Sequence, residues 1–342
     1  MIAPKEIILN ILSKDKSNNP RPGVGNPVSS TTTIQMEMTG SFFPEAHYNA
    51  GKMFELARAN YEILEYDMIM PVFSVVIESY ALGCKVDWGG PGMMPQVRGN
   101  IWESYEDIDI KEDFVSNHAV KAVLECISML KKSYPDVTIA GKVFGPWTLG
   151  YHFFGVEKFL IKTMDNPSEV KDILRKLSEV TLLFADAQIN AGADVLTVAD
   201  HATMDLCGPG AYRDFLIPIH SMLAKEIKVP IMLHICGDTL DRIEYICQTG
   251  VDAFHFESKV DACKAAGVNN GRIALIGNIN NPLTLLFKGP EDVRREVAYA
   301  IDCGVDIIGP ECAVPLTTPL ENLKEISRFA KSYKLKTGKL IK

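Results

Sequence analysis

The sequence lacks a surplus of basic residues: 35 lysines and arginines stand against 43 aspartates and glutamates, a formal net charge of −8. Because proteins that bind nucleic acid neutralise its phosphates with a basic face, we do not expect nucleic acid as a main partner. Apolar runs long enough to cross a membrane are also missing, and residues 1–6 lack the apolar core of a secretory signal. We therefore expect a cytoplasmic protein that does not enter a membrane.

The cysteines lack the pattern of a disulfide framework. Eight of them are scattered singly through apolar contexts in a chain of 342 residues. They are Cys84, Cys126, Cys207, Cys236, Cys247, Cys263, Cys303 and Cys312. This pattern is typical of reduced thiols, a few of which can be recruited to a metal. Four of them, Cys126, Cys247, Cys263 and Cys303, lie on helical patterns and are expected to pack as small apolar residues.

Strands and helices alternate along most of the chain, and the strands are almost continuously apolar. The predicted strands cover residues 23–30, 67–73, 138–144, 194–200, 230–236, 251–257, 272–278 and 305–309. The predicted helices cover residues 4–14, 49–65, 113–133, 153–164, 168–191, 210–227, 239–248, 259–266, 290–301 and 319–332. The alternation predicts a parallel sheet, and eight strands predict a closed (β/α)8 TIM barrel of the α/β class.

A doubly wound open sheet is the alternative architecture. No Gly-x-Gly-x-x-Gly turn follows an early strand, which argues against the dinucleotide-binding form of that fold. We interpret residues 1–342 as a single barrel domain in which residues 1–22 form an N-terminal helical extension. Residues 83–112 read as irregular and are too long for a routine connection, so we expect them to form a long loop that covers part of the barrel.

The strand at 230–236 ends in two potential metal ligands, His234 and Cys236. Residues two apart in a strand point to the same side, so the imidazole and the thiol should face one site together. Zinc is the first metal to consider for that pair. A His-x-Cys pair alone is weak evidence, because a hydrogen-bonded core histidine beside a buried thiol would have the same sequence.

Further polar residues follow the other predicted strands. Asp200 comes after the fourth strand, Glu257 closes the sixth, Asn278 closes the seventh, and Cys312 follows the eighth. Active sites of such barrels gather at the carboxyl ends of the strands. His, Cys, Glu and Cys brought to one rim would resemble a catalytic zinc site with one replaceable position.

Several of these residues also have structural interpretations. Asp200 with His201 could relay protons or only cap a loop, and Trp147 could wall the pocket or only pack a turn. His255 should point away from its strand neighbours and is expected to be structural. We predict Glu257 and Asp200 as catalytic residues and Trp147 and Asn278 as cofactor-binding residues.

Two short motifs carry a family resemblance. Residues 144–149 (Phe-Gly-Pro-Trp-Thr-Leu) and residues 72–74 (Val-Phe-Ser), followed by Ala-Leu-Gly at 81–83, resemble loops of the uroporphyrinogen decarboxylase superfamily. Within it the chain is most similar to the zinc-dependent corrinoid methyltransferases, whose metal site resembles that of cobalamin-independent methionine synthase. The resemblance implies zinc bound by His234, Cys236 and Cys312, with Glu257 as an exchangeable fourth ligand.

The chain departs from the decarboxylases at two places. It lacks their early motif of the Arg-Gln-Ala-Gly-Arg type, and Val75 stands where they have an aspartate after Phe-Ser. The resemblance therefore implies transfer of a methyl group from a methylcobamide to a thiol such as coenzyme M. The corrinoid would be carried on a separate small protein.

Three alternatives stay open. The acceptor could be tetrahydrofolate, with residues 83–112 holding the difference. The chain could be a zinc-free enzyme similar to the decarboxylases, which Val75 disfavours. It could also be a module that binds a corrinoid protein or stores zinc without catalysis. The upstream source of the methyl group belongs to the partner and leaves no trace in this sequence.

Overall fold

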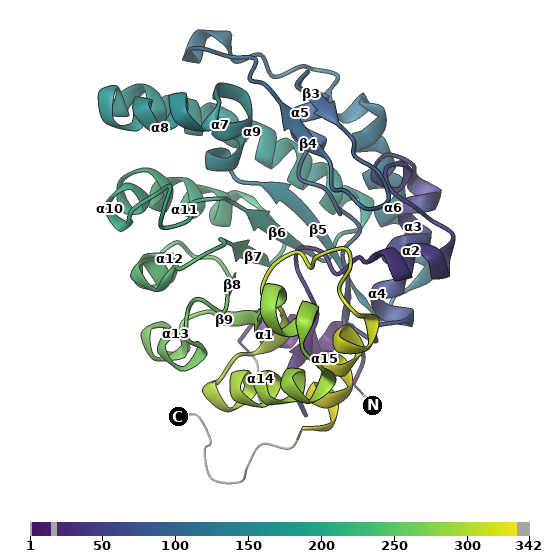
Figure 1. Ribbon diagram of the computed structural model, residues 1–342. Coiled ribbons are helices and arrows are strands. Elements are labelled where there is room, and N and C mark those ends of the chain that lie inside the picture. Colours follow the sequence, from purple (N-terminus) through teal and green to yellow (C-terminus); the bar gives the residue numbers. More distant parts are fainter. Residues whose placement is uncertain (1, 15–18, 334–342) are drawn as a thin grey trace.

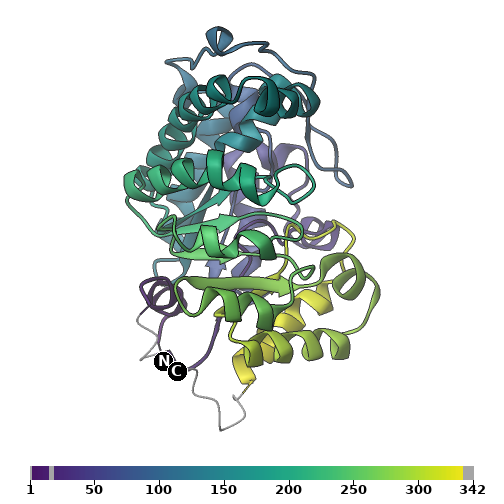
Figure 2. The same cartoon turned by 90° about the vertical axis from the view of Figure 1, so that its left-hand side faces the viewer.

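Within the residues that the computed structural model describes, 2–14 and 19–333, eight parallel strands form the interior and helices surround them (Figures 1 and 2). The strands are β1 (Gly23–Val24), β2 (Met68–Ile69), β5 (Thr138–Phe144), β6 (Val195–Ala199), β7 (Ile231–His234), β8 (Ala253–His255), β9 (Ala274–Ile279) and β10 (Ile307–Pro310). Their order in the sheet is β1-β10-β9-β8-β7-β6-β5-β2.

The sheet closes almost completely between β1 and β2 through the residue that precedes β2. The Asp67 backbone N–H donates to the Val24 carbonyl at 2.7 Å, and the Val24 N–H donates to the Asp67 carboxylate at 2.9 Å. Arg21 holds that carboxylate with two hydrogen bonds of 2.7 Å each. Such a bidentate pair fixes the geometry of both groups. The predicted (β/α)8 barrel is confirmed.

The helices lie outside the strands (Figure 1). They are α1 (Pro4–Leu12), α2 (Thr33–Thr39), α3 (Ala50–Ala57), α4 (Ala59–Glu62), α5 (Ile77–Ala81), α6 (His118–Ser133), α7 (Pro146–Phe154), α8 (Val156–Asp165), α9 (Pro167–Ala191), α10 (Pro209–Ala211), α11 (Ile217–Glu226), α12 (Ile243–Ile246), α13 (Ala262–Asn269), α14 (Pro290–Cys303) and α15 (Leu320–Ser332). In the described part of the chain, no helix combines the length and the apolar character that crossing a membrane requires.

Among the described residues, the longest helix is α9, and local signals mark both its start and its end. The Asn166 side chain accepts a hydrogen bond from the Glu169 N–H, and Pro167 occupies the first turn, where no N–H is needed. Gly192 ends the helix in the left-handed conformation, with φ 116°. The sequence analysis missed α7, because residues 145–147 read as a turn although Pro146 stands in its first turn.

Residues 83–112 are more regular than predicted. They contain an antiparallel hairpin of β3 (Lys85–Asp87) and β4 (Gln96–Arg98), which lies beside α5 and outside the barrel (Figure 1). The N–H groups of Ile101 and Trp102 both donate to the Phe153 carbonyl at 3.0 Å. The segment is therefore anchored on the end of α7.

One expectation about the cysteines is wrong. Cys263 of α13 and Cys303 of α14 are joined in a disulfide rather than packed as separate apolar thiols. The two helices lie against each other, and the Cα atoms are 4.6 Å apart. A separation of 40 residues in the sequence gives no indication of that proximity. Cys126 is buried within α6, as the packing interpretation predicts.

Candidate metal centre

Three side chains from the ends of two strands converge at the carboxyl-terminal rim of the barrel. His234 Nε2 lies 3.1 Å from Cys236 Sγ and 3.5 Å from Cys312 Sγ, and the two sulfur atoms are 3.5 Å apart. In the described residues these atoms form a group that could hold a metal ion, with all ligand atoms within 4.8 Å of one another. The prediction that His234 and Cys236 face one side is confirmed.

The local backbone explains how the first two side chains meet. Residues Ile231–Leu233 are buried, which fixes the orientation of β7 and directs His234 to its end. Gly237 follows with φ 82°, a conformation that glycine adopts without strain, and turns the chain away after Cys236. The histidine and the thiol therefore project from one short, well-packed segment.

The loop that carries Cys312 is held by other loops of the rim. The carbonyl of Cys312 accepts hydrogen bonds from the side-chain amides of Asn26 at 3.0 Å and Asn281 at 3.1 Å. The Glu311 carboxylate accepts the backbone N–H groups of Ser258 at 2.7 Å and Asn281 at 2.8 Å. These bonds tie the loops after β1, β8, β9 and β10 together and fix Cys312 opposite β7.

The electrostatics of the group favour a thiolate. A hydrogen bond from Cys236 holds the pKa of Cys312 well below its usual value, and the charge of His234 acts in the same direction. The shared proton correspondingly raises the pKa of Cys236. His255 packs on His234 with ring centroids 4.5 Å apart, and its Nε2–H donates to the Pro310 carbonyl at 2.9 Å. Burial lowers the pKa of His255, so it stays neutral and structural, as expected.

The donor set fits zinc. Zinc binds cysteine sulfur at about 2.3 Å and histidine nitrogen at about 2.0–2.1 Å, so two ligand atoms on one ion lie no more than about 4.6 Å apart. The three separations of 3.1, 3.5 and 3.5 Å satisfy that limit. Imidazole and thiolate are also ligands that zinc accepts, whereas magnesium and calcium prefer oxygen ligands.

A cavity of about 290 Å³ opens beside the three side chains. Its walls include the apolar Val28, Val75, Phe144 and Ala199. Val75, the position at which the resemblance implied a departure from the decarboxylases, therefore lies at the site itself. No residue of the segment 83–112 lines this cavity.

The two predicted catalytic residues lie at or near this centre. Asp200 lines the cavity. Glu257 is half-buried; burial and the charge of Cys312 raise its pKa, and Glu257 in turn contributes to the raised pKa of Cys236. Glu257 is thus a close neighbour of the three donors, but it is not one of the group whose ligand atoms lie together. That Glu257 acts as a fourth zinc ligand stays a prediction.

The two predicted cofactor-binding residues lie elsewhere. Trp147 has no exposed surface; it packs against Phe159 with ring centroids 5.2 Å apart and donates its indole N–H to Tyr151. Its neighbours Phe144 and Thr148 line the cavity instead. Asn278 lines a second cavity, of about 310 Å³, between β9 and α14.

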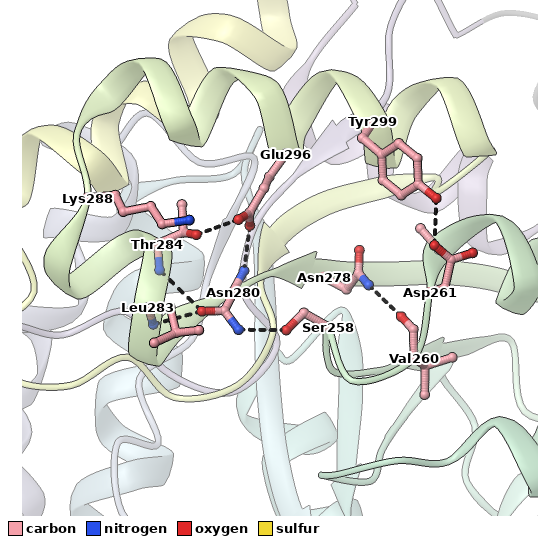
Figure 3. A pocket seen from close by; sticks show the side chains of 11 residues that line it. Ser258, Val260, Asp261, Asn278, Asn280, Leu283, Thr284, Lys288, Glu296 and Tyr299 are labelled. Atoms are coloured by element: carbon pink, nitrogen blue, oxygen red, sulfur yellow. Dashed lines mark hydrogen bonds between the residues drawn. The ribbon is translucent and has the colours of Figure 1, made fainter.

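Several polar groups that line this second cavity bind one another (Figure 3). Asn278 donates to the Val260 carbonyl at 3.0 Å, and Asn280 donates to the Ser258 hydroxyl at 2.8 Å. The Thr284 hydroxyl donates to Glu296. Because Asn278, Asn280 and Thr284 already have hydrogen-bond partners, these three side chains hold the loops of the rim together rather than offering free groups to a ligand.

Asp200 has a partner that the sequence analysis did not consider. Its carboxylate accepts hydrogen bonds from the Thr148 N–H at 2.8 Å and the Thr148 hydroxyl at 3.0 Å, and it lies 3.1 Å from His220 Nε2. The Tyr212 hydroxyl lies 2.8 Å from the other nitrogen of His220. The backbone N–H of His201 donates to the Thr148 hydroxyl at 2.7 Å. Asp200 therefore fixes the loops around the cavity, and the histidine that it binds is His220 rather than His201.

We expect Asp200→Ala to lower the free energy of unfolding by about 2–3 kcal/mol, because it leaves buried donors of Thr148 and His220 without an acceptor. Asp200→Asn should cost less, since its amide oxygen keeps the bonds from Thr148 and His220 can change tautomer to accept from the amide. Urea unfolding of both variants measures the difference. Equal stabilities of Asp200→Ala and the wild type would contradict this assignment.

The sequence analysis also missed Lys142 and Glu78. Lys142 lines the cavity, and Glu78 accepts the Phe144 N–H at 2.9 Å. Lys142 had a usable signal, because it is a charged residue in the middle of the apolar strand Thr138–Phe144. A charge at such a position requires a partner or a function. Glu78 gave no comparable signal.

Comparisons with known proteins agree with the geometry. Residues 22–333 match the family model for uroporphyrinogen decarboxylase (URO-D). The methylated-thiol–coenzyme M methyltransferase of Methanosarcina mazei is 32% identical over 309 residues, covering 90% of this chain and 83% of that protein. The methylcobamide:CoM methyltransferase MtbA of Methanosarcina acetivorans is 30% identical over 339 residues, covering 97% and 98%.

A solved structure supports the same relationship. A methyltransferase from Methanosarcina mazei has a TM-score of 0.92 to this chain at 27% sequence identity. The match covers 97% of this chain and 99% of that one, so the barrel and its loops correspond along nearly the whole length.

Proposed function

The chain belongs to the uroporphyrinogen decarboxylase family, and we propose that within this family it is a zinc-dependent methyltransferase. It would move a methyl group from a methylated corrinoid to a thiol acceptor such as coenzyme M. Relatives that carry methyltransferase names are about as long as this chain and align with most of it. The resemblance noted from the short motifs is confirmed at the level of the family.

The observation that carries the proposal is the group of His234, Cys236 and Cys312 at the wall of a cavity. A histidine and two cysteines would hold zinc and leave a position for another ligand. Glu257 is our candidate for that position, because it lies close enough to influence Cys236 electrostatically. The cavity of about 290 Å³ is near the lower end of small-molecule sites, which suits a small acceptor.

Zinc, when bound, would supply a Lewis acid that deprotonates a thiol at neutral pH. The chain's own residues prepare the site for this chemistry. The network around Asn26, Asn281 and Glu311 holds Cys312 in place, and His255 packs against the imidazole of His234. The apolar walls limit water around the acceptor sulfur, which strengthens electrostatic interactions there.

In the overall reaction, the sulfur of the acceptor would form a bond to the methyl carbon, and the proton of the thiol would be released to water. The bond between the methyl carbon and cobalt breaks, and its electron pair stays on the cobalt. Because the cavity is sized for a small molecule, we propose that the corrinoid is presented at the barrel mouth by a separate small protein. The carboxyl-terminal rim is the face where the donors and the cavity lie.

The proposal is tested by incubating the protein with methylcobalamin and candidate acceptors. We expect loss of the methyl-cobalt absorbance and formation of a methyl thioether, in proportion to bound zinc. Removal of zinc with a chelator should abolish the transfer, and added zinc should restore it. Transfer to tetrahydrofolate with none to any thiol would support the alternative acceptor. Zinc binding without transfer to either would leave only a binding module.

A further inference from the structure

Lys142 is a buried cation on the wall of the cavity that holds the three metal donors. It lies on β5 two residues before Phe144, so the two side chains point to the same side of the strand, and both line the cavity. Its relative exposure is 1%. In the described part of the chain, its Nζ atom has no hydrogen-bond partner.

A buried ammonium group without a partner is costly, so such groups normally pair or lose their charge. Burial lowers the pKa of Lys142 to about 8, so at neutral pH the ammonium form is still the major one. Glu78 acts on it from a distance, but its carboxylate already accepts the Phe144 N–H. Burial also raises the pKa of Glu78 to about 7, so Glu78 is an incomplete counter-charge.

We infer that Lys142 recognises an anionic group of the acceptor and thereby selects a small thiol that carries a sulfonate or carboxylate. This inference rests on the proposed function. One cavity contains a cation, the three potential metal ligands and apolar walls formed by Val28, Phe144 and Ala199. A short acceptor with a thiol at one end, an anion at the other and methylene groups between them complements all three features.

An anionic ligand would balance the positive charge of Lys142 more completely than the surrounding protein does. Its electrostatic partners in the structure are Glu78 and Cys312. If the ammonium served only to balance the sulfur ligands, its removal would affect every acceptor equally. If it binds the acceptor's anion, its removal would affect anionic thiols selectively. The two roles therefore differ in acceptor preference.

The first test measures binding without chemistry. Ethanesulfonate and propionate lack a thiol, so their binding to zinc-free protein by calorimetry reports on the anion site alone. We expect Lys142→Met to weaken binding of the preferred anion by about tenfold or more, because a hydrogen bond to a charged group contributes about that much to affinity. Glu78→Gln is the matched control, because its amide oxygen can still accept the Phe144 N–H and the ammonium remains. It should bind the anion at least as well as the wild type.

The second test compares acceptors in methyl transfer from methylcobalamin. For 2-mercaptoethanesulfonate or 3-mercaptopropionate, Lys142→Met should raise KM by about tenfold or more. For 2-mercaptoethanol, KM should change less than about twofold, because no charged contact is lost. The better of the two anionic thiols identifies the anion as sulfonate or carboxylate.

The outcomes separate the inference from the function on which it rests. Wild-type protein that methylates no thiol would contradict the proposed function. Wild-type protein that methylates 2-mercaptoethanol as well as the anionic thiols, or a Lys142→Met variant that loses activity equally with all of them, would overturn the inference only. Lys142→Met should also unfold at an equal or higher temperature than the wild type without ligand. Unfolding of that variant at ordinary temperature would show a structural ion pair instead.

Discussion

Cys312→Ser is expected to lose bound zinc and to reduce methyl transfer by about 100-fold or more. Loss of a single group that merely supports a metal ligand already costs about 10–100-fold in metal affinity or activity. Cys312 is itself one of the three donors, and it is the one whose pKa is held well below its usual value. A serine hydroxyl at this position stays protonated at neutral pH and offers a poor ligand to zinc.

The measurement pairs metal analysis of the purified variant with the methylcobalamin assay. Cys247→Ser is a suitable control, because Cys247 lies outside the donor group and its thiol contacts the Asn269 side chain at 3.4 Å, a contact that a hydroxyl can replace. The control should keep its zinc and its activity. Wild-type zinc content together with wild-type transfer in Cys312→Ser would refute the assignment of the metal site.

The barrel and the two strand-borne donors could be predicted from the sequence because their signals are local. Alternating apolar strands and helices show in a window of a few residues, and the spacing of His234 and Cys236 fixes a shared side through the geometry of a strand. Cys312 lies 76 residues beyond Cys236 and was placed by the order of the strands, since parallel strands of a barrel end at one rim.

Other parts of the site depend on contacts that no local pattern records. The pairing of Asp200 with His220, rather than with its neighbour His201, depends on how α11 packs against the loop after β6. Trp147 reads as a pocket aromatic, but α7 turns its ring into the packing against Phe159. The cavity near Asn278 belongs to the outer side of the rim, which strand order alone does not distinguish from the inner side.

At the rim, the backbones of β1 and β10 approach each other so closely that only glycine fits at position 309. We expect Gly309→Ala to lower the free energy of unfolding by about 3 kcal/mol, which is the upper end of the usual cost of overpacking. A Cβ atom at Gly309 would lie 2.0 Å from the Gly25 carbonyl oxygen. The contact is with backbone, and Gly25 cannot move freely because its N–H donates to the Ile308 carbonyl at 3.0 Å. Either β1 and β10 separate or the barrel seam distorts.

The same distortion should reach the metal donors, because Asn26 follows Gly25 and donates to the carbonyl of Cys312. We therefore expect Gly309→Ala to lose zinc affinity as well as stability, measured by urea unfolding and by metal analysis. Gly267→Ala is the matched control. Gly267 lies in α13, where an added Cβ meets nothing within 4 Å, so this substitution should stabilise the protein by about 0.5–1 kcal/mol. If Gly309→Ala behaved like Gly267→Ala, the close approach of β1 and β10 could not be what positions Cys312.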